Sequence, residues 1–313
     1  MTIARLIGFL VFAVFLEASA ATGQTTIAVR IATLPSDGGA QAFYAKDKGF
    51  FARGGLDAEV TVMNSSAIAP AIASGTFDIA QSTLATLAAA REHGQPFVVI
   101  APSQLFLIKL RPTAGIVVAK TSPIKTARDF SGKIVAVSQL LGIAQVTTEA
   151  WIDKNGGDSS TVKFIEMPPS AMVPALEQGR VDAAEFGEPE LAEALSRGHR
   201  SLSSGYEAVA NQFQIGAWYC TSSYAAAHPE VIRRFANVMA ETARWANAHQ
   251  GESGRILAKW TKLTVDPTMP RVIYGERLNL TLMQPLIDVA AKYKALRSSI
   301  PASEMIVTGI RLE

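Results

Sequence analysis

Two carboxylates three residues apart, Glu185 and Glu188, are the side chains whose type and spacing best fit a ligand site. They stand at the carboxyl end of the strand predicted over residues 181–186. From this position they can bind an amine or a ring N–H of a ligand, because both accept hydrogen bonds and carry negative charge. They can equally pair with an arginine or face solvent, and the sequence leaves these three uses open.

Hydroxyl side chains occur in five of the six loops that follow predicted strands. Ligands of open parallel sheets bind beyond the carboxyl ends of the strands, where helix N-termini offer free amides to polar groups. We therefore expect a small polar ligand at these loops, although each serine by itself also fits a helix cap. The expected ligand-binding residues in these loops are Ser36, Asp37, Ser65, Ser66, Ser82, Thr83, Ser138 and Ser170, besides Glu185 and Glu188.

Two aromatic residues, Tyr44 and Trp218, are also expected to contact the ligand. Tyr44 lies on the helix predicted after the first loop, and Trp218 lies in the last long strand. Aromatic contacts would suit a ligand that is partly flat or apolar. A place in the core is the alternative for each residue.

Side-chain sets for catalysis or metal binding are missing from the sequence. The four histidines are scattered, and no H-x-x-x-H pair, C-x-x-C pair or aspartate cluster supplies metal ligands. No G-x-S-x-G elbow, P-loop or G-x-G-x-x-G occurs either. The single cysteine, Cys220, lies in an apolar run and is expected to be a buried hydrophobic residue. We therefore expect a binding protein with no metal, cofactor or catalytic residue.

Size and charge narrow the class of protein further. A chain of 313 residues with 49% apolar residues can build two lobes, each with its own core. The chain carries 29 basic and 27 acidic residues, and no long run of one sign. Nucleic-acid binding needs a clustered basic face, so we expect no nucleic-acid partner.

The first twenty residues have the pattern of a signal peptide. Arg5 precedes an apolar run over residues 6–16, and Ala18, Ser19 and Ala20 give a small-x-small cleavage pattern. The run is too short to span a bilayer, which takes about 20 residues. We expect cleavage after residue 20 and a periplasmic mature protein.

Predicted strands and helices alternate along the chain, joined by short loops. This order predicts an α/β fold with mostly parallel sheets and helices on the sheet faces. A long amphipathic helix is expected over residues 229–249, with proline in its first turn. The expected strands cover residues 27–34, 56–63, 77–81, 97–101, 115–119, 133–138, 162–167, 181–186 and 213–221.

An internal repeat is the strongest pattern in the sequence. The segment S-A-x-x-P-A-x-x-x-G-x-x-D-x-A begins at Ser66 and again at Ser170, 104 residues later. We expect each serine at the N-cap of a helix, each proline in its first turn and each glycine at its end. Two copies of one β-α-β unit predict two equivalent lobes, with one wall of a cleft from each.

Two further stretches carry a resemblance to a known family. Residues 45–60, AKDKGFFARGGLDAEV, resemble the A-K-x-K-G-F-F-x-x-x-G-L signature of substrate-binding proteins of ABC importers. Residues 126–137, TARDFSGKIVAV, are similar to the segment that opens the second lobe in that family, and Glu188-Pro189 resembles its E-P pair. The nearest branch is the NMT1/THI5-like group, with binders of sulfonates, taurine, nitrate and the pyrimidine precursor of thiamine.

The resemblance implies a two-lobed periplasmic-binding-protein fold with a hinge between the lobes. Lobe 1 would comprise residues 25–110 and 223–313, lobe 2 residues 111–222, and the hinge would lie near Leu110 and Ser222. It further implies a monomer that delivers a small-molecule ligand to an ABC importer permease in the inner membrane. The ligand stays open among sulfonate, nitrate, pyrimidine, aromatic acid and amine.

Two other functions remain open alongside the importer role. The first is a pyrimidine-synthesising enzyme on the same scaffold, although those relatives are cytosolic and carry a cysteine-rich motif. The second is an extracytoplasmic sensor that presents its ligand to a receptor kinase, which this sequence does not distinguish from an importer component.

Overall fold

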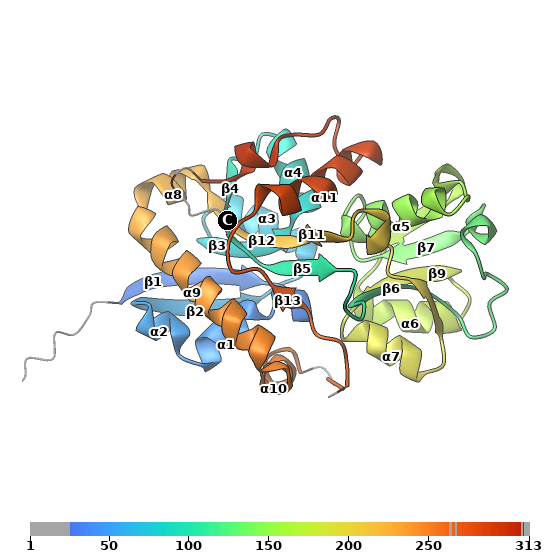
Figure 1. Ribbon diagram of the computed structural model, residues 1–313, viewed down its shortest axis with the longest axis horizontal. Helices are drawn as coiled ribbons and strands as arrows, with labels where there is room; N and C mark the ends of the chain where they lie inside the picture. Colours follow the sequence, from blue (N-terminus) through green and yellow to red (C-terminus); the bar gives the residue numbers. More distant parts are fainter. Residues whose placement is uncertain (1–25, 263–264, 267, 308, 310–313) are drawn as a thin grey trace, which may run out of the picture.

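The computed structural model describes residues 26–262, 265–266, 268–307 and 309. Within this part of the chain the strands form two five-stranded sheets and one three-stranded sheet (Figure 1). The expected signal peptide, residues 1–20, lies outside the described residues. No helix among the described residues has both the length and the apolar character that crossing a membrane requires.

The first sheet is built mainly from the N-terminal part of the chain. Strand β1 pairs in parallel with β2 and β3, while β12 runs antiparallel between β3 and β4. The prediction of a mostly parallel sheet is therefore confirmed, with one reversed strand. In sheet order the strands are β2 (Leu56–Val62), β1 (Ile27–Thr33), β3 (Ile79–Thr83), β12 (Gly216–Thr221) and β4 (Phe97–Pro102).

Helices cover both faces of the first sheet, and we call this assembly lobe 1. One face carries α1 (Gln41–Asp47), α2 (Phe50–Arg53), α8 (Ser222–Ala227) and α9 (Pro229–Ala248). The other face carries α3 (Ser65–Ala73), α4 (Leu84–Glu92) and α11 (Leu280–Lys292). The long amphipathic helix is confirmed as α9, and α10 (Gln250–Thr261) packs against α1.

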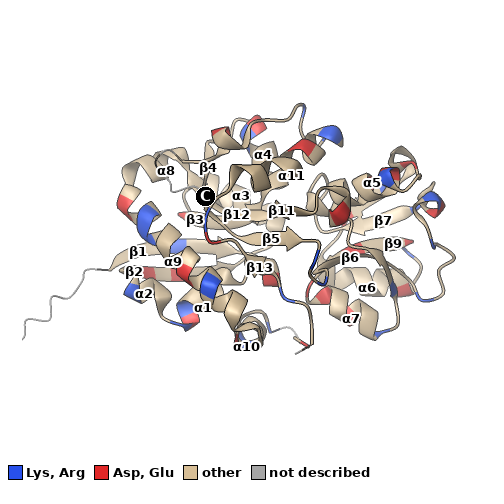
Figure 2. Ribbon diagram, in the orientation of Figure 1, with Lys and Arg blue, Asp and Glu red and all other residues tan. Residues whose placement is uncertain are grey.

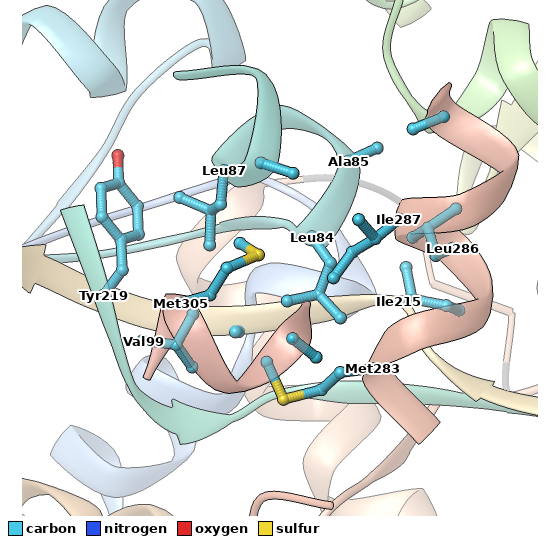
Figure 3. Packing of buried hydrophobic residues seen from close by; sticks show 14 of the residues in the cluster. Leu84, Ala85, Leu87, Val99, Ile215, Tyr219, Met283, Leu286, Ile287 and Met305 are labelled. Atoms are coloured by element: carbon cyan, nitrogen blue, oxygen red, sulfur yellow. The ribbon is translucent and has the colours of Figure 1, made fainter. Parts of the chain in front are cut away.

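The core between α4 and α11 shows why lobe 1 needs the C-terminal helices. Leu84 and Leu87 of α4 belong to one hydrophobic cluster with Met283 and Ile287 of α11 (Figure 3). All four side chains are buried. A buried aliphatic side chain contributes about 1.5–3 kcal/mol to folding, so this face of the sheet depends on residues nearly 200 positions further along the chain.

The second sheet, with its helices, forms lobe 2. Strand β7 pairs in parallel with β8 and β9, whereas β6 runs antiparallel to β9 and β10. Helix α5 (Ile143–Lys154) covers one face, and α6 (Pro169–Glu177) and α7 (Glu190–Ser196) cover the other. In sheet order the strands are β10 (Arg200–Ser203), β6 (Ala114–Val118), β9 (Ala183–Gly187), β7 (Ile134–Val137) and β8 (Lys163–Glu166).

A small third sheet lies where the chain passes between the lobes (Figure 1). In this link sheet β5 (Gln104–Leu107) pairs antiparallel with β11 (Gln212–Gln214) and with β13 (Ile273–Tyr274). The chain leaves lobe 1 after β5 and returns through β11. The expected lobe boundary at residue 222 is wrong, because it places β12 in lobe 2. Strand β12 (Gly216–Thr221) instead pairs with β3 and β4 in the first sheet.

The two copies of the repeat have the same backbone arrangement. Asp78 accepts a hydrogen bond from the Arg30 amide at 2.8 Å, and Asp182 accepts one from the Ile134 amide at 2.8 Å. Both donors also lie 104 residues apart. Each aspartate thus binds the backbone of the neighbouring parallel strand, β1 for Asp78 and β7 for Asp182. The repeat marks two equivalent units, as predicted.

The expected position of the repeat serine and proline in each helix is wrong. The N-cap residues of α3 and α6 are Asn64 and Pro168, so Ser66 and Ser170 are the second residues of their helices. The prolines, Pro70 and Pro174, fall within the second turn. Proline has no amide N–H to donate at this position. The carbonyl group of each repeat serine, four residues earlier, therefore lacks its helical hydrogen bond.

We predict that Asp182→Ala lowers the free energy of unfolding by about 1.5–3 kcal/mol, the range for a hydrogen bond to a charged group. The Ile134 amide would lose its acceptor. Chemical denaturation of the variant measures the loss. Asp57→Ala is the control, because the Asp57 side chain is 72% exposed and its contact to Lys46 is 4.0 Å long. An equal effect of the two substitutions would contradict the role of Asp182.

Candidate functional site

The loops at the carboxyl ends of the strands meet where the two lobes face each other. Gln139, just after β7 of lobe 2, accepts hydrogen bonds from Ser65 at 3.0 Å and from Thr86 at 3.3 Å, both in lobe 1. A second contact joins the Asp37 amide to the Glu188 carbonyl oxygen at 3.4 Å. The lobes therefore touch directly through the loops in which the sequence predicts the ligand site.

The predicted hydroxyl residues have different roles in these loops. Ser36 caps the short turn Asp37–Gly39, and Thr83 caps α4 through the Thr86 amide at 3.3 Å. Ser82 is 8% exposed at the end of β3, and no hydrogen bond of its hydroxyl group is found among the described residues. The three remaining serines, Ser66, Ser138 and Ser170, are exposed.

Asp37 is a scaffold residue rather than a free ligand contact. Its carboxylate forms a bidentate pair with Arg271, one bond of which, from Nε to Oδ2, is 3.0 Å long. It also accepts hydrogen bonds from the Val272 amide at 2.9 Å and from the Tyr44 hydroxyl at 3.2 Å. The side chains of Asp37 and Arg271 are 1% and 6% exposed. The carboxylate is thus already satisfied by protein groups.

The two aromatic ligand contacts expected from the sequence are core residues. Tyr44 is fully buried between Asp37 and Arg271, and its hydroxyl accepts a bond of 2.6 Å from the Arg271 guanidinium. Trp218 is fully buried in the cluster under α9, and its indole N–H donates to Gln41 at 2.7 Å. Buried aromatic residues with a satisfied polar group belong to the core, so both predictions are wrong.

Glu185 differs from Asp37 in having no partner among the residues that the structure describes. It lies on β9, opposite Ile116 of β6, and is 5% exposed. No hydrogen bond or ion pair of its carboxylate is found among the described residues. Burial therefore raises the pKa of this carboxyl to about 8, because nothing compensates for the lost hydration of the charged form.

Tyr206 is the titratable neighbour of Glu185. It is 7% exposed, and burial, with the nearby Glu185 carboxylate, raises the pKa of its phenol well above the usual value. Its ring packs edge-on against Phe106 of β5 at 5.6 Å and against Phe213 of β11 at 5.8 Å. These three rings therefore form an aromatic cluster at the crossing between the lobes.

Glu188 also lies at the contact between the lobes, but it has a partner. Its carboxylate accepts a hydrogen bond of 3.0 Å from the Ala192 amide in α7. Burial raises the pKa of Glu188 to about 7, although the hydrogen bond from the Ala192 amide acts in the opposite direction. The two acidic residues three apart are therefore not a pair: Glu188 supports a helix, and Glu185 is unpaired.

Several residues of this region escaped the sequence prediction. Gln139 stands in a loop in which only Ser138 is predicted to bind ligand, and its side chain connects lobe 2 to Ser65 and Thr86 of lobe 1. Arg271 lies 234 residues from Asp37 in a segment without any recognisable motif. Within the described residues, no group of three or more His, Cys, Asp or Glu side chains has an arrangement that could hold a metal ion.

Removal of Arg271, the positively charged partner of Asp37, should lower the stability of the folded protein. We predict that Arg271→Met lowers the free energy of unfolding by about 3–5 kcal/mol, the range for leaving one buried charge unpaired. Arg255→Met is the control, because Arg255 is exposed on the neighbouring α10. Denaturant titration of both variants tests this, and a loss below 1 kcal/mol for Arg271→Met would contradict the structural role of the pair.

The raised pKa of Glu185 predicts a pH dependence of stability. The folded protein holds a proton on this carboxyl that the unfolded chain releases, so stability falls as the pH rises from about 4.5 to about 8. Glu185→Gln mimics the protonated, neutral form of Glu185. It should therefore remove the part of the decrease in stability that comes from ionisation of Glu185. Melting temperatures at pH 5 and pH 8 compare the two proteins, with Glu188 titrating equally in both. If the melting temperatures of both proteins change equally between pH 5 and pH 8, ionisation of Glu185 costs the folded protein little free energy.

Solved structures share this architecture across nearly the whole chain. The periplasmic aliphatic sulphonate-binding protein SsuA from Escherichia coli has a TM-score of 0.73 and 19% identity, covering 91% of this chain and 98% of SsuA. The periplasmic nitrate-binding protein NrtA from Synechocystis has a TM-score of 0.74 and 15% identity, covering 89% and 84%. The desulfurization enzyme DSZB has a TM-score of 0.67 and 13% identity, covering 90% and 97%.

At these identities the structures establish the fold alone. No curated protein sequence matches the chain. The profile of the NMT1/THI5-like family matches residues 39–253, which is more than half of the 313 residues. The chain therefore belongs to the NMT1/THI5-like family and has the two-lobed fold of periplasmic binding proteins.

Proposed function

We propose that the protein is an extracytoplasmic solute-binding protein of an ABC importer. It captures a small polar or partly aromatic solute between its two lobes and delivers it to a permease. The observation that carries this proposal is the set of hydrogen bonds that Gln139 accepts from Ser65 and Thr86 across the lobes. Such contacts between loops at strand ends are what a closed binding protein makes around its ligand.

The family and the fold neighbours support the same role. SsuA is described as a periplasmic sulphonate-binding protein and NrtA as a periplasmic nitrate-binding protein. In our proposal lobe 2 is the continuous segment between β5 and β11, and lobe 1 comprises the rest of the described chain. The link sheet then serves as the hinge, because both crossing segments pair within it.

An enzymatic function is a second candidate on one observation, the likeness to the desulfurization enzyme DSZB. The chain offers little for nucleophilic catalysis. Its single cysteine, Cys220, is buried in the core of lobe 1, and burial raises the pKa of the thiol to about 12. The reactive thiolate is therefore scarce at neutral pH.

Thermal unfolding with a panel of small solutes tests binding against catalysis. The panel holds alkylsulfonates, nitrate, pyrimidines, aromatic carboxylates and amines. A ligand at about a hundred times its Kd adds ~2.7 kcal/mol of stability, which raises the melting temperature by several degrees. Binding followed by recovery of the solute unchanged supports our proposal. Chemical conversion of the solute by the purified protein would refute it.

A variant at the contact between the lobes tests the mode of binding. Gln139→Ala removes two hydrogen bonds of the closed state, each with a net value of about 0.5–1.5 kcal/mol. We predict a roughly tenfold weaker affinity for whichever panel solute binds, with an almost unchanged melting temperature of the free protein. Gln178→Ala, at an exposed position at the end of α6, is the control. Calorimetric titration measures both, and unchanged affinity in Gln139→Ala would contradict the closure contact.

A further inference from the structure

Helix α5 of lobe 2 contacts lobe 1 both through the turn before it and along one of its faces. The turn carries Gln139, whose side chain accepts hydrogen bonds from Ser65 and Thr86. Further along the helix, Val146 is fully buried in the same hydrophobic cluster as Ile287 of α11, and the two helices pack together. In the solute-binding role proposed above, closure of the lobes therefore depends on how α5 and its turn are held.

The turn before α5 is held in a strained conformation by a side chain of the helix. Leu141 has a φ of 57°, in the left-handed region that a bulky side chain rarely adopts. It is 46% exposed, so burial of its side chain does not compensate for the strain. Its amide donates to Gln145 Oε1 at 2.8 Å, because the third residue of a helix can reach back to an amide before the first turn. Gln145 thus stabilises the turn that carries Gln139.

Glu149 fixes the orientation of the Gln145 side chain. Glu149 Oε1 accepts a hydrogen bond from Gln145 Nε2 at 3.1 Å. A carboxylate oxygen accepts but does not donate, so the amino group of Gln145 faces Glu149 and its carbonyl oxygen faces Leu141. A chain of hydrogen bonds therefore runs from the strained turn through Gln145 to Glu149.

The second oxygen of Glu149 is buried on the side of α5 that meets lobe 1. Glu149 follows Val146 by three residues, and residues at this spacing lie on one side of a helix. The Oε2 atom is buried, and no hydrogen bond of this atom is found among the described residues. Tyr293, which ends α11, packs on the same hydrophobic cluster as Val146, and its hydroxyl is also buried. A charge on Glu149 would thus lie in a dry contact between the lobes.

The groups around Glu149 favour its neutral form. Burial raises the pKa of Glu149 to about 7; the hydrogen bond from Gln145 opposes this rise, and the Asp153 carboxylate adds to it. Elsewhere, charged residues of both signs are dispersed over the two lobes (Figure 2). The charged and titratable side chains on the other elements packed against α5 are Lys292, Tyr206, Glu207, Arg128, Asp129 and Glu185. Lys292 lies over the Tyr293 ring, with its Nζ atom 5.2 Å from the ring centroid.

We propose that Gln145 and Glu149 hold the turn that carries Gln139, and that a proton on Glu149 at the contact between α5 and α11 favours closure of the lobes. With the proton on Oε2, Oε1 still accepts from Gln145, so the hydrogen-bond chain to Leu141 is intact. Loss of the proton leaves a negative charge near Asp153 in a buried contact, and separation of the helices lets water hydrate it.

The direction of the pH effect follows from the two states of Glu149. In separated lobes the carboxyl is hydrated and releases its proton near its ordinary pKa of 4.5, whereas closed lobes hold the proton up to about pH 7. Closure is therefore fully favoured below about pH 4.5, weakens as the pH rises to about 7, and stays weak above it.

The distance between the lobes at two pH values tests this inference without a ligand. Spin labels are placed on Ala226→Cys in α8 and Gln178→Cys at the end of α6, because both positions are exposed while Cys220 is buried. We expect the ratio of closed to open protein to fall about tenfold from pH 5 to pH 8. In Glu149→Gln, which is neutral and keeps an acceptor for Gln145, the ratio should stay high at both pH values.

A variant of Gln145 separates the role of the hydrogen-bond chain from that of the charge. Gln145→Leu removes the acceptor of the Leu141 amide and should give separated lobes at both pH values. Addition of Leu141→Gly should restore closure, because glycine adopts a positive φ without strain. A general loss of stability would show no such rescue. Glu193→Gln, which removes an exposed charge from lobe 2, is the control and should respond to pH as the wild type does.

Equal distances at both pH values in the wild type would overturn the inference. A pH response that persists in Glu149→Gln would also overturn it, since Glu185 or Glu188 would then be its source. Neither result bears on the solute-binding role, which the thermal test with the solute panel decides separately. Should Glu149→Gln not fold, Gln145→Leu and its rescue by Leu141→Gly decide, and closed lobes in Gln145→Leu would refute the proposal.

Discussion

The buried carboxylate of Asp37 holds together parts of the chain that are far apart in sequence. Its partners are Tyr44 in α1 and both Arg271 and the Val272 amide near β13. Because the charge is removed from water, it requires all of these donors at once, and their positions are fixed in turn. The same loop donates its Asp37 amide to Glu188 of lobe 2. The loop that follows β1 is thus anchored to the C-terminal segment.

Asp37 and Glu185 are two buried carboxylates with opposite surroundings. Both side chains are almost completely buried, yet Asp37 has a full set of donors and Glu185 has none among the described residues. Asp37 is thus stabilised by donors that the protein itself supplies, whereas burial without such donors raises the pKa of Glu185 to about 8. Burial by itself does not identify a functional carboxylate; burial without a partner is the informative combination.

The sequence predicted what depends on local periodicity and on repetition. The two β-α-β units, the amphipathic helix α9 and the buried Cys220 follow from residues close together in the chain. The pairing of Asp37 with Arg271 and the reversed strand β12 join residues more than 100 positions apart, and no local pattern encodes them. Trp218 illustrates the difficulty: an aromatic residue within a strand looks the same in sequence whether it faces a ligand or, as here, the core under α9.

The central place of β12 in the first sheet has a consequence for the order of folding. Strands β3 and β4 do not pair with each other, since Gly216–Thr221 lies between them. Until that segment has been synthesised, the edges of both strands remain without hydrogen-bond partners, whereas the continuous segment of lobe 2 can already close its own sheet. Lobe 1 therefore completes its fold last, although its first strand leaves the ribosome first, and its long-range pairing makes this the slow step.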